Sequence, residues 1–569
     1  MANSLLKQKM GRFIHAIQTI FQENMWFIAF LFLLNVTTTG WSLLKAHNYD
    51  VLLSYSFSMF FASFGVAALV QILYNPILKN LVKILLLLIT GSIFIVEFFA
   101  MYNYNILIGV GIINSIFETN IREAKEFLQM YVGLREIIGV VGILTAIILV
   151  KRNHTSFCKF NHAKPNKIVL GALAIGLVYT IRMVTVYTDY FTDNQYLPLQ
   201  RAYASAQTAL KNIEAYNTLS ANVKKEIVLT ENKGKIKNIV FLLGESTNRN
   251  HMSLYGYDLP TTPNLQKLKN SGEIAVFNNV ISPHSTTIAV LSKLFTFCDY
   301  ESTKEWYEYN NLIDIMNSAG YKTFWLSNQE SSGIWGNVAQ LFAEHSSKHE
   351  YTRIRESRED YGIVDGELFP LIDRALAERS DKNFFVIHLM GAHGLYYNRY
   401  PYAFTKFHPE DINLEAKDSA KLVVSQYDNA VYYNDYIVNE IINKFRDDET
   451  LFVYVSDHGE AVYDESDFAG HIEENPSRHM IEIPMIVWGS EKFKENYPEK
   501  MEKIYDSVER PYMTDDLIHT VLDLADIKTA DFDQTRSIVN DDFNAARKRI
   551  FKERDYDKEI LMGIDNKTN

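Results

Sequence analysis

The chain has 569 residues, of which 47% are hydrophobic and 22% are charged, a composition that excludes a largely disordered protein. Its formal net charge of −12 is unevenly spread: residues 1–190 hold 15 Lys/Arg and 8 Asp/Glu, and residues 191–569 hold 41 and 60. The acidic second part argues against nucleic acid as a partner, because binding phosphate backbones requires a basic surface. The presence of only two cysteines excludes a disulfide scaffold and a Cys-rich zinc module.

Five apolar stretches in the first third are long enough to cross a bilayer, which needs about 20 helical residues. They are Met25–Leu44, Val51–Tyr74, Leu81–Tyr102, Leu128–Val150 and Ile168–Tyr187. Lys and Arg gather in the N-terminal segment and in the second and fourth loops, whereas the first and third loops are neutral or acidic. Because positively charged loops stay in the cytoplasm, five crossings place the rest of the chain outside it. We therefore predict a transmembrane domain over residues 1–189.

Charged residues also fall inside these spans, where an unpaired charge is costly. They are Glu97, Arg135, Glu136 and Arg182, and the predicted topology places all four toward the outer leaflet. Two interpretations stay open. The charges pair between helices or reach the interface, or they line a polar vestibule that receives a lipid headgroup.

Residues 190–234 are too polar to cross a bilayer and form a predicted bridge to the next domain. Apolar side chains recur there at the spacing of one helix face. They are Leu199, Tyr203, Ala206, Leu210 and Ile213. This amphipathic helix either lies on the membrane surface or packs beneath the next domain.

From residue 235 onward, short apolar runs alternate with helical patterns, which is typical of a sheet covered by helices on both faces. The predicted strands are 236–243, Thr323–Leu326, Phe384–Leu389, Leu451–Val455 and Ile483–Trp488. The predicted helices are Leu312–Met316, Phe369–Leu376, Tyr427–Phe445 and one that begins after Thr514. Residues past about 531 are charged and are expected to form a surface tail. The predicted fold is thus a five-helix membrane domain followed by an α/β domain (residues 235–569) with a mostly parallel central sheet.

Residues that can carry chemistry follow two of these strands. Glu245 comes after the first predicted strand, and Asp457 and His458 come after the fourth. Parallel strands bring these three to one edge, where two carboxylates and an imidazole make a zinc site with one position left for a nucleophile or water. Each residue alone is more simply a helix cap or a turn residue. The prediction therefore rests on their joint placement.

Three hydroxyl side chains precede a helical pattern in the segment SPHSTTIA: Ser285, Thr286 and Thr287. A hydroxyl at a helix start beside zinc can lose its proton and attack phosphorus, but the spacing does not choose among the three. Imidazoles that can bind phosphate oxygens, ligate a second metal or protonate a leaving group follow later along the chain. They are His388, His393 and His471.

Two segments, GESTNRNHMSLYGY from Gly244 to Tyr257 and SDHGE from Ser456 to Glu460, together with the hydroxyl segment, resemble the membrane-bound phosphoethanolamine transferases. These are Gram-negative envelope enzymes of the alkaline phosphatase/sulfatase superfamily, with five N-terminal spans and a periplasmic catalytic domain. The resemblance covers nearly the whole chain. It is closer to the branch that modifies lipopolysaccharide core sugars than to the branch that modifies lipid A.

The resemblance implies a zinc-dependent transferase of the bacterial inner membrane. It would move phosphoethanolamine from phosphatidylethanolamine to lipopolysaccharide or lipid A through a covalent phosphoethanolamine-threonine intermediate. The implied metal ligands, for one zinc ion with a second as an option, are Glu245, Thr287, Asp457 and His458. The implied catalytic residues are Thr287 (with Thr286 as the fallback), His388 and His393. The implied substrate-binding residues are Asn248, His471, Thr119, Glu123 and Ser115.

Two departures from the lipid A modifiers argue against a lipid A acceptor. Pro283 and Lys293 stand where those enzymes carry cysteines, and residues 328–333 lack their lysine. A phosphoglycerol transferase of the lipoteichoic acid synthase type, using phosphatidylglycerol, is the alternative, because it shares the spans and the superfamily domain. The sequence argues against a sulfatase, since neither Cys158 nor Cys298 begins the Cys-x-Pro-x-Arg pattern that formylglycine requires. A membrane-anchored binding module without activity would be expected to lack some of the metal ligands. All of them are present in this sequence, which argues against that class.

Overall fold

The computed structural model describes residues 2–45, 47–104, 107–109, 112–113, 116, 175–176, 178, 197–220, 227–330, 338–353, 364–473 and 476–561. These residues divide into two compact units. One holds the N-terminal helices and the chain up to Leu210, and the other holds the chain from Lys211 onward.

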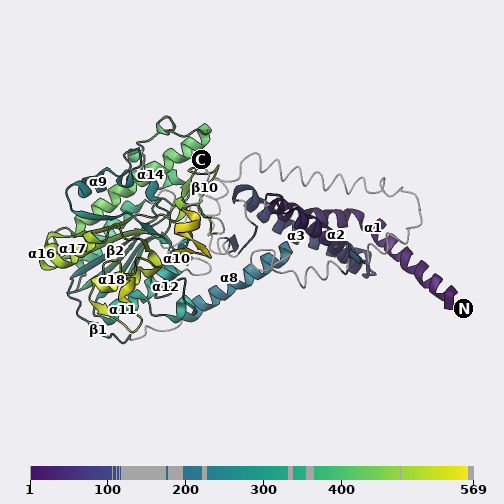
Figure 1. Ribbon diagram of the computed structural model, residues 1–569, viewed down its shortest axis with the longest axis horizontal. Helices are drawn as coiled ribbons and strands as arrows, with labels where there is room; N and C mark the ends of the chain where they lie inside the picture. Colours follow the sequence, from purple (N-terminus) through teal and green to yellow (C-terminus); the bar gives the residue numbers. More distant parts are fainter. Residues whose placement is uncertain are drawn as a thin grey trace. The chain divides into compact units, whose positions relative to one another are not determined.

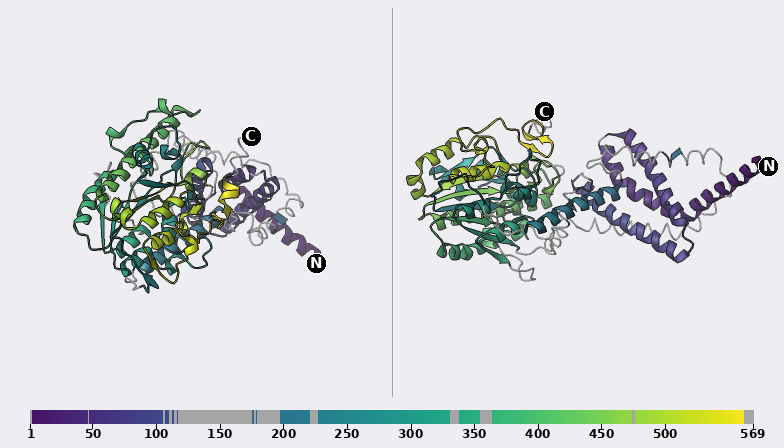
Figure 2. Two further views of the ribbon diagram at one scale, coloured as in Figure 1. Left: turned by 60° about the vertical axis from the view of Figure 1, so that its left-hand side comes forward. Right: turned by 90° about the horizontal axis from the view of Figure 1, so that it is seen from below.

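Three helices of the first unit are long and apolar enough to cross a membrane. They are α1 (Ala2–Lys45), α2 (Tyr49–Gln71) and α3 (Pro76–Tyr104). α1 packs against both α2 and α3 (Figure 2). Phe27, Leu31 and Val70 are buried in an apolar cluster between these helices. These helices match the first three predicted spans. The fourth and fifth predicted spans lie outside the described residues, apart from positions 175, 176 and 178.

The charged residue of α3, Glu97, is buried and pairs with Arg201 of α8 (Pro198–Ser220). Nη2 of Arg201 lies 2.6 Å from Oε1 of Glu97 and donates to Oγ1 of Thr39 at 2.9 Å. Thr38 donates to Oε2 of Glu97 at 2.5 Å. Because either charge alone would be costly to bury, the structure supports pairing as the interpretation of Glu97. The partner comes from the predicted bridge rather than from another span.

The apolar face of α8 points away from this ion pair. Leu199, Tyr203 and Leu210 are 50%, 63% and 48% exposed, whereas Arg201 and Ser205 are buried. The helix therefore buries a polar face and leaves an apolar face open. Both placements that the sequence allowed, on the membrane surface and beneath the next domain, stay predictions.

The second unit is built on a seven-stranded sheet with the order β3-β11-β8-β2-β7-β5-β6. Its strands are β3 (Ile274–Phe277), β11 (Met485–Gly489), β8 (Thr450–Ser456), β2 (Asn238–Gly244), β7 (Asn383–His388), β5 (Lys322–Glu330) and β6 (Lys348–Arg353). β8, β2, β7, β5 and β6 are parallel, but β11 is antiparallel to both β8 and β3. The sheet is therefore mixed, because the chain leaves β8 at one end of the sheet and re-enters through β11 from that same end.

Alternate residues of β2 face two separate cores. Phe241 and Leu243 pack into one apolar cluster, and Val240 and Leu242 pack into the other. Helices cover both faces of the sheet (Figure 1). The first cluster includes residues of α10 (Thr287–Leu294), α11 (Leu312–Ser318), α12 (Val338–His345), α16 (Glu491–Asn496), α17 (Pro498–Asp506) and α18 (Leu517–Leu524). The second includes residues of α9 (Pro263–Asn270), α13 (Leu368–Ala377) and α14 (Asp418–Phe445).

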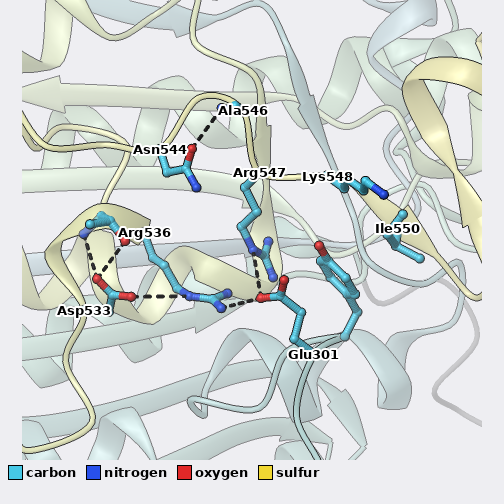
Figure 3. Close-up of a pocket in the computed structure, with 10 residues that line it drawn as sticks. Glu301, Asp533, Arg536, Asn544, Ala546, Arg547, Lys548 and Ile550 are labelled. Carbon is cyan, nitrogen blue, oxygen red and sulfur yellow. Dashed lines mark hydrogen bonds and ion pairs between the residues drawn. The ribbon is translucent and has the colours of Figure 1, made fainter.

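The expectation of a surface tail past residue 531 is wrong. Ile538 and Phe551 are buried in the domain. Arg536 and Arg547 line a pocket in which both guanidinium groups extend toward Glu301 (Figure 3). The charged side chains that suggested a solvent-exposed segment instead form ion pairs with the rest of the domain. A low content of apolar residues therefore did not indicate a surface tail.

The loop after β2 is tied to α14 through a buried histidine. His251 lies between two carboxylates, with Nδ1 2.7 Å from Oδ1 of Asp428 and Nε2 2.9 Å from Oδ1 of Asp464. Burial alone would lower the pKa of His251, but the two carboxylates raise this pKa to about 10. A charged imidazolium therefore bridges the loop and the helix at neutral pH.

We predict that His251→Gln lowers the free energy of unfolding by about 3 kcal/mol or more at pH 6, because it removes the cation that pairs with the buried carboxylate of Asp428 and the partly buried carboxylate of Asp464. The pKa of His251 is raised on folding, so its stabilisation is complete below its ordinary value of 6.5 and is lost as the pH rises through about 10. Thermal melts of the purified protein between those two pH values should show that the difference in melting temperature between wild type and variant becomes smaller as the pH rises.

The matched control is His349→Gln, at an exposed histidine, which should leave the melting temperature unchanged. A gap for His251→Gln that stayed constant with pH would contradict the electrostatic cause.

Candidate metal centre

The residues that follow β2 and β8 meet at one edge of the sheet. The two strands are parallel neighbours, with Gly244 opposite Ser456, and the N–H of Asp457 donates to the carbonyl oxygen of Gly244 at 3.1 Å. Glu245 extends β2, and Asp457 and His458 extend β8. The structure thus brings together the three side chains that the sequence placed at two separate strand ends.

These three side chains offer a compact set of donor atoms. One atom of each lies within 4.8 Å of the others. Nε2 of His458 is 3.3 Å from Oε1 of Glu245 and 3.4 Å from Oδ2 of Asp457. Nδ1 of His458 is 2.8 Å from the carbonyl oxygen of Gly459, so a proton on Nδ1 leaves the lone pair of Nε2 directed at the carboxylates.

One oxygen of this set accepts no hydrogen bond, although it lies near His458. Oδ2 of Asp457 is buried and accepts no hydrogen bond from the residues that the structure describes. A buried carboxylate oxygen in that state is costly unless a cation neutralises it. Two carboxylates, one imidazole and an orphaned oxygen fit a divalent cation such as zinc.

The charges of the three groups also favour a cation. Burial raises the pKa of Asp457 well above its usual range, and the adjacent Glu245 raises it further. Burial opposes ionisation of Glu245 too, but the hydrogen bond and charge of His458 hold the pKa of Glu245 below its usual range. The same two carboxylates overcome burial and raise the pKa of His458 to about 10. The acidic surroundings of His458 therefore favour a positive charge at this site.

Thr287 is the first residue of α10 and adjoins the cluster. Its Oγ1 lies 3.2 Å from each carboxylate oxygen of Glu245 and 3.3 Å from Nε2 of His458. Thr286, the N-cap of α10, makes no capping hydrogen bond with its side chain. Ser285 donates its hydroxyl to Glu473 instead, at 3.1 Å. Of the three hydroxyls that the spacing left open, Thr287 is the one that reaches the acidic cluster.

The three predicted histidines surround this point in different states. His388, at the end of β7, is fully buried, and burial lowers its pKa to about 4, so it is neutral at pH 7. Burial also lowers the pKa of His393. His471 places Nδ1 2.6 Å from Oε2 of Glu460, and its ring centroid is 4.2 Å from that of His458. His458, Glu460 and His471 form a second group of potential metal ligands.

Asn248 plays a local structural part. It is fully buried, its Oδ1 accepts from the N–H of Asn250 at 2.9 Å, and its Nδ2 donates to the carbonyl oxygen of Glu460 at 2.9 Å. Its amide is therefore engaged within the protein rather than open to a ligand. The membrane-side residues Ser115, Thr119 and Glu123 lie outside the described residues.

Two residues that the sequence analysis did not single out support the acidic cluster. Gln329, near the end of β5, donates Nε2 to Oε2 of Glu245 at 3.1 Å. Ser246 donates its hydroxyl to Oε1 of Glu245 at 3.0 Å and its N–H to Oδ1 of Asp457 at 3.1 Å, from a left-handed φ of 54°. The available signal for Gln329 was its place just after a predicted strand, at the edge where ligands bind.

The backbone of Glu245 is approached closely by Gly391, which follows β7. A Cβ at Gly391 would lie 2.3 Å from the carbonyl oxygen of Glu245, and its φ of 54° is strained for any other residue. Asp365 holds this turn by accepting the N–H groups of Met390 and Gly391 at 2.8 and 2.9 Å. A glycine is therefore required where the loop after β7 passes against the backbone of Glu245.

Residues 237–527 match the Sulfatase family, and residues 59–203 match the family described as phosphoethanolamine transferase EptA/EptB. The chain is 32% identical over 485 residues to the phosphoethanolamine transferase EptC of Escherichia coli K12, covering 79% of this chain and 80% of that protein. It is 25% identical to the phosphoethanolamine transferase EptA of Helicobacter pylori, covering 71% of this chain and 75% of that protein.

Solved structures agree with these matches. The C-terminal periplasmic domain of Escherichia coli EptC, in complex with Zn, is 32% identical and aligns with a TM-score of 0.55 over 58% of this chain and 96% of its own. The integral membrane protein EptA from Neisseria meningitidis shares the fold with a TM-score of 0.64 at 21% identity, over 90% of this chain and 97% of its own. The chain therefore belongs to the family of membrane-bound phosphoethanolamine transferases with a sulfatase-type catalytic domain.

Proposed function

We propose that this enzyme transfers phosphoethanolamine from phosphatidylethanolamine to lipopolysaccharide or lipid A, with Thr287 as the nucleophile at a zinc site. The observation that carries the proposal is the contact of the Thr287 hydroxyl with Glu245 and His458, within 3.3 Å of both. The zinc complex of the Escherichia coli relative supports the choice of metal. Pro283 and Lys293, in the places of family cysteines, favour a core sugar as acceptor over lipid A.

In this proposal residues 1–189 form a five-span domain in the inner membrane, residues 190–234 form the bridge, and residues 235–569 form the periplasmic catalytic domain. A membrane domain suits the reaction, because the donor is a lipid. Ser115, Thr119 and Glu123 would approach the donor headgroup from the membrane side.

Glu245, Asp457 and His458 would hold the zinc ion, with Thr287 completing the set. Bound there, zinc would favour the deprotonated hydroxyl and neutralise charge on the phosphoryl oxygens. Glu245 accepts the Thr287 hydrogen bond and so orients this oxygen, and the positive end of α10 favours its negative charge.

The reaction then has two balanced steps. The oxygen of Thr287 forms a bond to the phosphorus of the donor while the bond from phosphorus to the glycerol oxygen breaks, and diacylglycerol leaves with the proton. An acceptor hydroxyl next attacks the same phosphorus while the bond from phosphorus to the Thr287 oxygen breaks, and the proton of the acceptor hydroxyl passes to Thr287. His393 and His471 would contact the phosphoryl oxygens and the leaving oxygen. His388, neutral at pH 7, would serve as a hydrogen-bonding group or as a ligand of a second zinc.

Removing the proposed nucleophile tests the mechanism. We predict that Thr287→Ala lowers turnover roughly 10³-fold or more, because no covalent intermediate can form. Mass spectrometry of the wild-type protein after incubation with donor alone should find the added phosphoethanolamine on the peptide that contains Thr287. Thr286→Ala is the matched control and should keep near wild-type turnover. Modification of Thr286 instead of Thr287 would contradict the assignment.

The close approach of Gly391 to Glu245 gives a second test. We predict that Gly391→Ala abolishes activity and lowers the free energy of unfolding by several kcal/mol, because both the new Cβ contact and the positive φ are unfavourable. Gly394→Ala is the control, since Gly394 also has a positive φ, of 26°, but its Cβ would meet no atom within 4 Å. Equal effects of the two substitutions, by turnover and thermal melts, would show that the contact with Glu245 is unimportant.

The donor is tested with lipid vesicles. We predict that the full-length protein releases diacylglycerol from phosphatidylethanolamine and not from phosphatidylglycerol, measured by chromatography of the lipid products. Release from phosphatidylglycerol alone would favour the phosphoglycerol transferase alternative. Mass spectrometry of lipopolysaccharide from cells with and without the protein then locates the added group on core sugars or on lipid A.

A further inference from the structure

A carboxylate outside the proposed metal set grips the turn that leads to the nucleophile. Oε1 of Glu473 lies 2.6 Å from Nδ1 of His284. Oε2 of Glu473 accepts the N–H of Ser285 at 2.8 Å and the hydroxyl of Ser285 at 3.1 Å. Both oxygens of one buried side chain are thus used on two adjacent residues. This side chain contributes to none of the contacts that define the metal centre.

The turn has little other freedom. The hydroxyl of Ser282 donates to the carbonyl oxygen of His284 at 2.6 Å, and the N–H of Ser282 donates to the carbonyl oxygen of Ile481 at 2.8 Å. α10 begins at Thr287, two residues after Ser285, and its buried side chains Val290, Leu291 and Leu294 fix the rest of the helix in the core. The position of the Thr287 oxygen therefore depends on the turn that Glu473 holds.

Glu473 lies in a short loop that also contacts the residues around His458. His471, two residues before Glu473, contacts Glu460 at 2.6 Å and lies against the ring of His458. One short loop therefore contacts the acidic cluster through an imidazole and the nucleophile turn through a carboxylate. A shift of this loop would move both sides of the site together.

We propose that Glu473 is a positioning residue that sets the place of the Thr287 oxygen, and that His284 orients Glu473 for this task. The inference rests on the proposed role of Thr287. Its consequence is kinetic, because a displacement of about 1 Å in a reacting group costs on the order of 10²-fold in rate. The donor lipid does not need this contact in order to bind, so its KM should not change.

The test compares three variants of the full-length protein in phosphatidylethanolamine vesicles. Glu473→Ala removes all the contacts to the turn and should lower kcat and the rate of Thr287 modification about 10²-fold, with donor KM and zinc content unchanged. Glu473→Gln keeps an oxygen that can accept both Ser285 bonds, and it should restore most of the rate. Glu495→Ala, at an exposed carboxylate, is the matched control and should behave as wild type.

Several outcomes would overturn the proposal. Wild-type kcat in Glu473→Ala would do so, as would equal impairment of Glu473→Ala and Glu473→Gln. A fall in zinc content or melting temperature that accounts for the lost rate would reduce Glu473 to general structural support. If Glu473→Ala does not fold, His284→Ala decides, since it keeps the Ser285 bonds and should still lower kcat by about tenfold. Thr287→Ala serves as the separate check: wild-type turnover in that variant would refute the proposed function itself.

Discussion

Two carboxylates buried side by side at the ends of neighbouring parallel strands impose the central constraint on this molecule. Glu245 and Asp457 cannot both be ionised at that edge without a positive charge beside them, because like charges in a dry environment repel strongly. The orphaned Oδ2 of Asp457 and the raised pKa of His458 are two expressions of the same demand. A divalent cation held by both carboxylates would meet this requirement, which supports the proposed metal site.

The surrounding fold is arranged to hold that edge in place. The strands are buried on both faces, so their register is fixed by two independent cores. The left-handed backbone at Ser246 turns its hydroxyl and its N–H onto the two carboxylates, and Gly391 lets the next loop pass against the backbone of Glu245. An unfavourable backbone conformation such as this one persists only where the surrounding contacts hold it in place. The proposed nucleophile, Thr287, comes from a separate element, α10, which is anchored by the core at one end and, through the turn before it, by Glu473 at the other.

The features of this fold that depend on local hydrophobic pattern could be predicted from the sequence. All five predicted strands are present, and the residues after two of them meet as expected. β3 and β6 were not predicted, because β3 is short and β6 (KHEYTR) is polar and lies at the edge of the sheet. The antiparallel course of β11 was missed because a buried apolar run reads the same in either direction.

Contacts between segments distant in sequence were beyond pattern reasoning. The pairing of Glu97 with Arg201 joins a predicted span to the bridge. The local sequence around either residue does not indicate which residue it pairs with. The charged segment past residue 531 looked solvated because its carboxylate partners, such as Glu301, lie far upstream. The same holds for Gln329 and Glu473, whose roles appear only when the loops around the sheet edge are in place.

The most direct test of the central claim is anomalous diffraction at the zinc edge from crystals grown with zinc. The account predicts one peak bonded to an oxygen of Glu245, an oxygen of Asp457 and Nε2 of His458, at about 2.0–2.2 Å, with Oγ1 of Thr287 beside it. A zinc peak elsewhere would contradict the account. So would a structure in which these four side chains point away from one another and bind no zinc.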